Sequence, residues 1–166
     1  MKVVIIGGVA GGASAAARLR RLDEKAEIIM IERTGFVSYA NCGLPYYVGN
    51  VIERKENLTL QTPQSFRKRF RVDARVRQEV LEIDRNEKRV TIKKLDTGEI
   101  YQETYDKLIL SPGAKANRPS IEGMDRISAD GKARIMTLKT VEDTLHMKTF
   151  IDEKKPKTAV VIGGGF

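Results

Sequence analysis

Apolar residues follow two periodicities along the chain, and these predict two kinds of β-sheet. Runs that are apolar almost throughout, at residues 2–6, 26–31 and 107–110, are typical of parallel strands buried on both faces. Between the second and third runs, three segments alternate apolar with polar residues, as in an antiparallel meander. These segments are residues 79–84, 89–95 and 99–105. We therefore expect an α/β fold with a parallel sheet and an inserted antiparallel β-meander.

Helical patterns connect these strands. Residues 13–22 are rich in alanine and carry arginines in the later turns, where cations suit the helix dipole. A basic helix is expected at residues 63–70, after Thr62 as a favourable N-cap. The other expected elements are a strand at residues 71–76, a short element at 134–138, and an amphipathic helix at 141–151 capped by Thr140.

A glycine-rich turn at residues 7–12 lies between the first strand and its helix. Such a turn lets the backbone approach a pyrophosphate closely, and the helix N-terminus meets the phosphate charge. The first and last glycines of the dinucleotide pattern are present, but Val9 replaces the middle one. Glu32 ends the second strand, at a spacing suited to ribose hydroxyls, and Arg33 follows it. We expect a dinucleotide site; the alternative is a glycine-bearing turn without a ligand.

Cys42 is the only cysteine and lies ten residues past Glu32. A thiol near a nucleotide site indicates electron transfer between a cofactor and sulfur, and a buried structural cysteine is the alternative. One cysteine forms no internal disulfide, which fits a reducing cytosol. Its redox chemistry would pass through a mixed disulfide, a persulfide or a sulfenic acid. Pro45 marks the first turn of an expected helix, whose N–H groups and dipole would stabilise the thiolate.

Composition narrows the classes of function. The chain has 166 residues, a net charge of +8 and a single histidine, His146. A single histidine argues against metal sites built from several histidines and against His-dependent catalytic triads, so we expect no metal site and give His146 no catalytic role. No apolar run approaches the roughly 18 to 20 residues of a membrane span. The positive charge suits a phosphate-bearing small molecule, and the basic and aromatic residues of 66–71 have the helical spacing of a solvated face rather than a nucleic-acid site.

The motifs, taken in this order, resemble the FAD-binding part of the pyridine nucleotide-disulfide oxidoreductases. Residues 105–113 are similar to that family's second flavin motif, and residues 160–165 resemble the opening of its NAD(P)H domain. The resemblance implies an FAD-binding domain at residues 1–118, a connecting segment at 119–153, and the first strand and glycine turn of a Rossmann-like NAD(P)H domain at 154–166. Because the second glycine turn stops before its helix, we expect the front part of a longer protein, which alone binds FAD weakly or not at all and has no turnover. The alternative for this segment is a short C-terminal edge strand that ends in a glycine tail.

The surroundings of Cys42 indicate a subgroup. Family members with a redox-active disulfide carry a second cysteine five positions on, where this chain has Tyr47. Residues 41–46 are most similar to the coenzyme A-disulfide reductases and related persulfide reductases. The resemblance implies that NADH or NADPH reduces FAD and that Cys42 attacks CoA disulfide, CoA persulfide or a related small disulfide. It also implies a cytoplasmic homodimer that binds neither nucleic acid nor membrane. The rival hypotheses are an NADH oxidase or peroxidase with a Cys42 sulfenic acid, and a non-catalytic nucleotide- or nucleic-acid-binding module.

The expected site residues come from these motifs and from the resemblance. Those expected to hold FAD are Gly7, Gly8, Val9, Ala10, Gly11, Gly12, Glu32, Arg33, Val80, Ser111, Pro112 and Gly113. Those at substrate-contacting positions by resemblance are Ser14, Arg18, Arg21, Ser38, Asn41, Lys68 and Arg69. The first three share one face of the first helix, and the arginines suit the phosphates of coenzyme A. The alternative is solvated surface arginines, with ordinary turn chemistry at Ser38 and Asn41.

Overall fold

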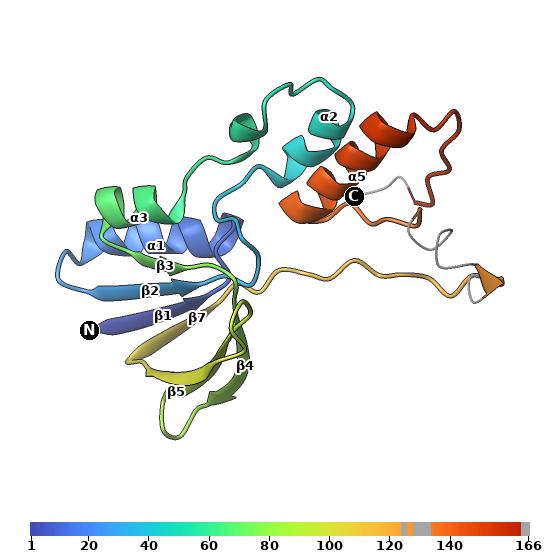
Figure 1. The fold of residues 1–166 in the computed structure, drawn as a ribbon. Coiled ribbons are helices and arrows are strands. Elements are labelled where there is room, and N and C mark those ends of the chain that lie inside the picture. The colour runs from blue at the N-terminus through green and yellow to red at the C-terminus, as the bar shows by residue number, and fades with distance from the viewer. Residues whose placement is uncertain (124–125, 128–133, 164–166) are drawn as a thin grey trace.

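A computed structural model describes residues 1–123, 126–127 and 134–163 of the chain, and these form three layers (Figure 1). The middle layer is a parallel sheet with the strand order β3–β2–β1–β7. Its strands are β1 (Lys2–Ile6), β2 (Glu27–Ile31), β3 (Asp73–Arg75) and β7 (Lys107–Leu110). The three apolar runs thus form adjacent strands, which confirms the predicted α/β class.

Two helices, α1 (Ala10–Leu22) and α3 (Pro63–Phe70), cover one face of this sheet (Figure 1). Phe66 of α3 and the odd-numbered residues of β1 are buried in the same apolar cluster on that face. Thr62 caps α3 as predicted, in a reciprocal pair of hydrogen bonds with Ser65. The first helix begins three residues earlier than predicted, because the last two glycines of the turn are already helical.

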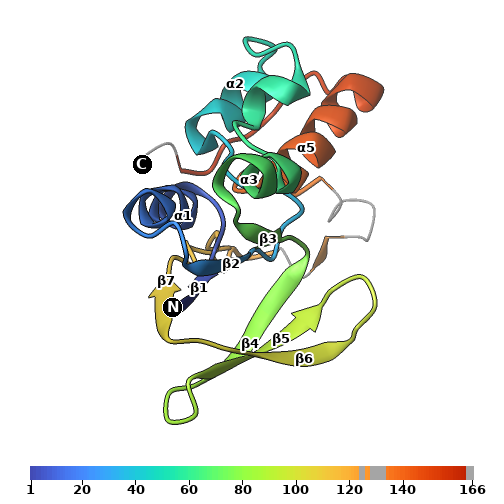
Figure 2. The same cartoon turned by 90° about the vertical axis from the view of Figure 1, so that its left-hand side faces the viewer.

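The antiparallel meander covers the opposite face (Figure 2). It consists of β4 (Gln78–Asp84), β5 (Arg89–Lys94) and β6 (Ile100–Thr104), paired in that order. Val90 and Ile92 of β5 pack against Val4, Ile29 and Ile31 of the parallel sheet. Successive side chains of a strand point to opposite faces, so the fully apolar pattern of β1 and β2 reflects a helix layer on one side and the meander on the other.

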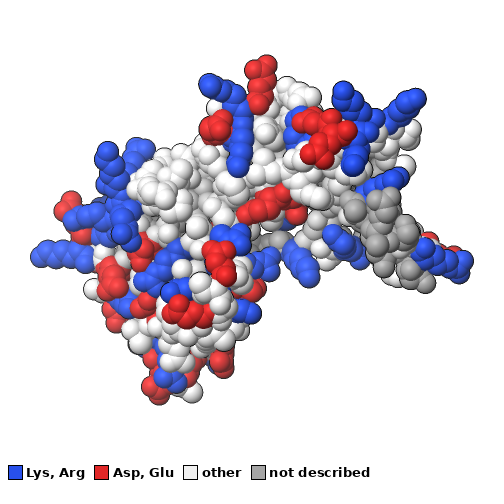
Figure 3. Space-filling view, viewed as in Figure 1, with Lys and Arg blue, Asp and Glu red and all other residues white. Residues whose placement is uncertain are grey.

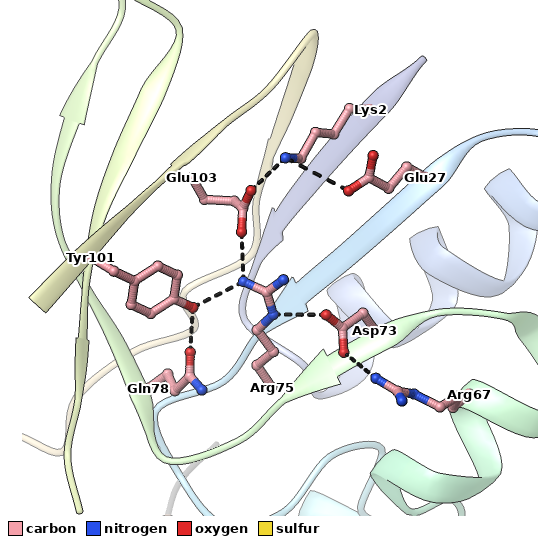
Figure 4. Close-up of polar contacts among 8 residues, drawn as sticks. All are labelled: Lys2, Glu27, Arg67, Asp73, Arg75, Gln78, Tyr101 and Glu103. Atoms are coloured by element: carbon pink, nitrogen blue, oxygen red, sulfur yellow. Dashed lines mark hydrogen bonds and ion pairs between the residues drawn. The ribbon is translucent and has the colours of Figure 1, made fainter. Parts of the chain in front are cut away.

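A polar network also joins the meander to the parallel sheet (Figure 4). The Arg75 guanidinium donates to Asp73 Oδ2 at 2.8 Å, to Glu103 Oε2 at 2.7 Å and to the Tyr101 hydroxyl at 3.0 Å. Lys2 forms an ion pair with the other oxygen of Glu103. The network therefore fixes the end of β3 against β6.

The remaining elements surround the cysteine. A 3-10 turn (Asn41–Gly43) leads into the short α2 (Leu44–Val48), and a second 3-10 turn spans Lys55–Leu58. Helix α5 (Val141–Lys154) begins after its predicted cap, Thr140, and lies beside α2 in both ribbon views (Figures 1 and 2). None of the helices in the described part of the chain is long and apolar enough to cross a membrane.

Three sequence expectations differ from the structure. The strand expected at residues 71–76 is shorter, because Arg71 adopts a left-handed conformation that ends α3. Residues 134–138 form neither helix nor strand. Residues 159–163 form no strand, and Val160 and Val161 are exposed, since no described strand lies beside them to pair with their backbone. The rest of that predicted glycine turn, residues 164–165, lies outside the described residues.

Candidate functional site

An open cavity of about 420 Å³ lies beyond the carboxyl ends of the central strands. Ile6 ends β1, Ile31 ends β2 and Ser111 follows β7, and all three residues line the cavity. Val80 contributes a wall from the meander. In open parallel sheets, ligands bind at this edge, where loops and helix N-termini converge.

The predicted glycine turn forms the floor of the cavity and presents the N-terminus of α1. The first hydrogen bond within α1 runs from the Ala13 N–H to the Val9 carbonyl, at 3.0 Å. The N–H groups of residues 9–12 therefore have no acceptor within the helix. Val9 supplies no capping side chain, and the first turn of α1 contains no acidic residue. These backbone donors are therefore available to an anion such as a pyrophosphate.

Close backbone contacts explain two of the glycines. A Cβ atom on Gly12 would lie 1.8 Å from the carbonyl oxygen of Gly7. A Cβ atom on Gly7 would lie 1.9 Å from the carbonyl oxygen of Ser111, and Gly7 has a φ of +97°. The turn after β7 is thus pressed against the glycine turn in a way that no larger residue allows. This close backbone packing leaves room for a pyrophosphate beside the turn, which fits a dinucleotide.

Glu32 lies beside the glycine turn and is almost fully buried. Its Oε2 accepts from the Gly8 N–H at 2.8 Å, and its Oε1 accepts from the backbone N–H and the hydroxyl of Thr34, both at 2.8 Å. The carboxylate also lines the cavity, so it can accept hydrogen bonds from ligand hydroxyls there. Arg33 lines the cavity as well and forms an ion pair with Glu79 at 3.5 Å.

The structure brings most of the expected cofactor residues to one cavity. Ten of the twelve line it, namely Gly7, Val9, Ala10, Gly11, Glu32, Arg33, Val80, Ser111, Pro112 and Gly113. The other two, Gly8 and Gly12, do not line it but hold Glu32 and the turn in place.

Other lining residues were missed by the sequence patterns, among them Tyr39, Gln78, Lys139 and Thr140. The sequence predicted Thr140 only as a helix cap, and it predicted no site role for the other three residues. Burial, together with the charges of Glu32 and of acids at the start of α5, raises the pKa of Tyr39 to about 12, so its hydroxyl stays protonated at neutral pH.

Cys42 lies in the middle of the 3-10 turn and is exposed. The buried alternative for this cysteine is therefore wrong. Its neighbour Asn41 lines the cavity. The Ser38 N–H donates to the Gly8 carbonyl at 2.9 Å, which ties the loop before the cysteine to the glycine turn. The thiol is thus held next to a residue of the cavity wall while it stays open to a second molecule.

Of the expected substrate residues, only Asn41 lines the cavity. Ser14, Arg18 and Arg21 lie exposed on α1, as Lys68 and Arg69 do on α3. Lys and Arg side chains gather over these two helices in the space-filling view (Figure 3). No described group of acidic, histidine or cysteine side chains forms a metal site. His146 is exposed on α5.

The family described as pyridine nucleotide-disulphide oxidoreductase matches residues 1–166. The chain belongs to this family. Its members are flavin-dependent oxidoreductases that use NAD(P)H, and the fold, the glycine turn and Glu32 all agree with this assignment.

Comparison with individual proteins shows which members of the family the chain resembles. The chain is 40% identical over 165 residues to a coenzyme A disulfide reductase of Staphylococcus epidermidis, covering 99% of this chain and 36% of that protein. The crystal structure of reduced Bacillus anthracis CoADR-RHD has a TM-score of 0.87 at 54% identity, covering 94% of this chain and 27% of that one. An NAD-dependent persulfide reductase from A. fulgidus has a TM-score of 0.81 at 36% identity, with coverage of 92% and 27%.

A more distant likeness is to a water-forming NADH oxidase from Lactobacillus brevis. Its TM-score is 0.78 at 27% identity, and the match covers 93% of this chain and 32% of that one. The chain therefore spans about a third of the length of the proteins that it resembles.

Proposed function

We propose that this chain is the FAD- and cysteine-bearing part of an NAD(P)H-dependent reductase of CoA disulfide or CoA persulfide. One observation carries the proposal: the thiol of Cys42 is exposed, and the residue before it, Asn41, lines the cavity that holds the glycine turn and Glu32. The likeness to the coenzyme A disulfide reductase and to the persulfide reductase supports the choice of substrate.

The residues of the cavity fit the parts of FAD. The free N–H groups of residues 9–12 would bind the pyrophosphate, and the Glu32 carboxylate would accept from the ribose hydroxyls. The turn after β7, at Ser111, would border the cofactor beside the glycine turn. When bound, the flavin supplies two-electron exchange between NAD(P)H and sulfur.

Cys42 would perform the sulfur chemistry. Its thiolate attacks one sulfur of CoA disulfide, a bond forms between Cys42 and that sulfur, and the other CoA leaves as a thiolate. An electron pair then cleaves the new bond, which releases the second CoA thiolate and restores the Cys42 thiolate. With a persulfide, the same attack on the outer sulfur releases CoA and leaves the sulfane sulfur on Cys42. Cys42 is the only cysteine of this chain, and Tyr47 stands five positions on, so the proposal uses no dithiol formed within this chain.

The basic helices offer a place for the rest of the substrate. The CoA moiety carries several phosphate charges, and the exposed cations Arg18, Arg21, Lys68 and Arg69 lie on neighbouring helices of one layer. Ser14, Ser38 and Asn41 would contact the part of the substrate nearer the thiol. The same proposal includes a cytoplasmic location, whose reducing conditions suit a catalytic thiol, and a homodimer as the functional form.

The test is a Cys42→Ser variant of the full-length protein, assayed with NADH or NADPH and CoA disulfide. We expect turnover to fall at least about 100-fold, because an alcohol cannot form the mixed disulfide. Visible flavin absorbance should be retained, since Cys42 is not part of the cofactor cradle. Full disulfide turnover by the variant would overturn the proposal.

The likeness to the NADH oxidase supports a second candidate, in which peroxide or oxygen oxidises Cys42 to a sulfenic acid. NADH-dependent oxygen consumption without any disulfide, together with trapping of Cys42 by a sulfenic-acid reagent, would favour this candidate. A binding module without catalysis would instead show no NADH oxidation with any of these acceptors.

A further inference from the structure

The hydrogen bonds around Tyr101 have a fixed direction (Figure 4). Arginine carries donors only, so the Tyr101 hydroxyl must accept from Arg75 Nη1, at 3.0 Å. The same hydroxyl then uses its one hydrogen to donate to Gln78 Oε1, at 2.5 Å. A side-chain amide has one oxygen and one NH₂ group, so this contact decides which end of the Gln78 amide faces Tyr101.

The other end of that amide is a hydrogen-bond donor. Gln78 lines the cavity, and its Nε2 makes no hydrogen bond to another described residue. Its backbone N–H donates to the carbonyl of Glu32 at 3.0 Å, which places Gln78 next to the carboxylate expected at the ribose. The glycine turn follows β1, Glu32 follows β2 and Gln78 comes after β3, and these strands lie side by side in that order. Gln78 is therefore on the far side of Glu32 from the glycine turn, where the base beyond the ribose would lie.

We infer that Gln78 binds the adenine ring of the cofactor by donating its side-chain NH₂ to a ring nitrogen, and that Tyr101 and Arg75 are positioning residues for this contact. Adenine ring nitrogens are acceptors and suit such a donor. The inference rests on the proposed FAD site and adds a determinant of its adenosine half. Arg75 is itself held in place by its hydrogen bonds to Asp73 and Glu103. Because Arg75 can only donate, its position determines the direction of the hydrogen bonds through Tyr101 to Gln78.

The test measures the affinity of the full-length apoprotein for FAD and for FMN, which lacks the adenosine, by quenching of flavin fluorescence. Gln78→Leu should weaken FAD about five-fold, the equivalent of one ordinary hydrogen bond, and leave the affinity for FMN unchanged. Tyr101→Phe should weaken FAD about two- to three-fold, because the amide of Gln78 is then free to flip. Tyr105→Phe is the matched control, since among the described residues the hydroxyl of Tyr105 hydrogen-bonds only to the Asp84 carbonyl, at 3.5 Å.

A double variant separates positioning from general stability. In a Gln78→Leu background, Tyr101→Phe should cause no further loss of FAD affinity, whereas a merely structural role would weaken binding equally in both backgrounds. The inference is overturned if Gln78→Leu binds FAD as the wild type does, if it weakens FMN equally, or if the Tyr101 effect persists without Gln78. Failure of the wild type to bind FAD would instead refute the proposed function.

Discussion

The glycine turn (residues 7–12) and the cysteine loop (residues 38–48) meet at one cavity, but they are built in different ways. The glycine turn is packed backbone against backbone at Gly7 and Gly12, with distances that exclude a Cβ atom at either position. The cysteine loop consists of single turns of helix held mainly by main-chain hydrogen bonds, and the Cys42 side chain is exposed. Under the proposed function, we therefore expect cofactor binding and folding to depend on the same atoms of the glycine turn, whereas the thiol can be changed without disturbing the fold.

The largest expected effect comes from Gly12→Ala. The new methyl group would meet the Gly7 carbonyl at 1.8 Å, so the turn and α1 must move apart. We expect the free energy of unfolding to fall by about 3 kcal/mol, with loss of flavin from the purified full-length protein. Urea unfolding and the visible spectrum measure the two effects.

Gly49→Ala serves as its control, because the added Cβ would lie at an ordinary 3.5 Å from the Pro45 carbonyl oxygen. This variant lies just past the cysteine loop and should keep both flavin and stability. Equal damage from the two substitutions would contradict the contrast between the two regions.

The next effect concerns Arg20, which the sequence pattern groups with its exposed neighbours. Its guanidinium is buried and donates five hydrogen bonds to backbone carbonyls, three of them in residues 23–26 and two in residues 70–71. Arg20→Met leaves these acceptors without their donor, so we expect a loss of about 2 kcal/mol in urea unfolding. Arg18→Met, on the exposed face, should change stability by less than about 0.5 kcal/mol. Similar changes in unfolding free energy for the two variants would show that the buried hydrogen bonds of Arg20 do not stabilise the fold.

A smaller effect is expected on the acid side of the pH scale. Burial raises the pKa of Glu103, but the hydrogen bonds and charges of Lys2 and Arg75 outweigh it, so the net pKa lies below the ordinary 4.5. The stabilisation is therefore present above pH 4.5 and is lost as the pH falls through the lowered pKa. Glu103→Gln should cost about 1 kcal/mol at pH 7 and make the acid decline shallower.

Urea titrations between pH 7 and pH 3 measure this change. Glu53→Gln, at an exposed position with no ion pair to the described residues, should leave the curve unchanged. An acid decline that is as steep in Glu103→Gln as in the wild type would show that other carboxylates cause it.

The smallest expected effect on stability is that of Cys42→Ser. The side chain is exposed, so we expect a change in unfolding free energy within about 0.5 kcal/mol, even though disulfide turnover is lost. A large destabilisation would mean that the cysteine loop is as tightly coupled to folding as the glycine turn is.

The elements with strong local signals were predicted well. Alternation in residues 79–105 indicated the meander, and Thr62 and Thr140 marked the starts of α3 and α5. The second apolar run with a glycine turn, at residues 159–163, was predicted as a strand but forms none, because a strand exists only where a neighbour satisfies its backbone. Nothing local distinguishes that segment from β1.

Residue type and spacing were enough to predict which residues form the glycine turn, that an acid follows the second strand, and that a single thiol lies close by in the chain. These features depend on residue type and spacing, which are properties of the chain. The packed structure was needed to show that Arg20 is buried against residues 70–71 while Arg18 is exposed, that Gln78 and Tyr101 lie together, and that Lys139 and Thr140 reach the cavity. These contacts join segments far apart in the sequence, and their partners are chosen by the packing of whole layers rather than by any local pattern.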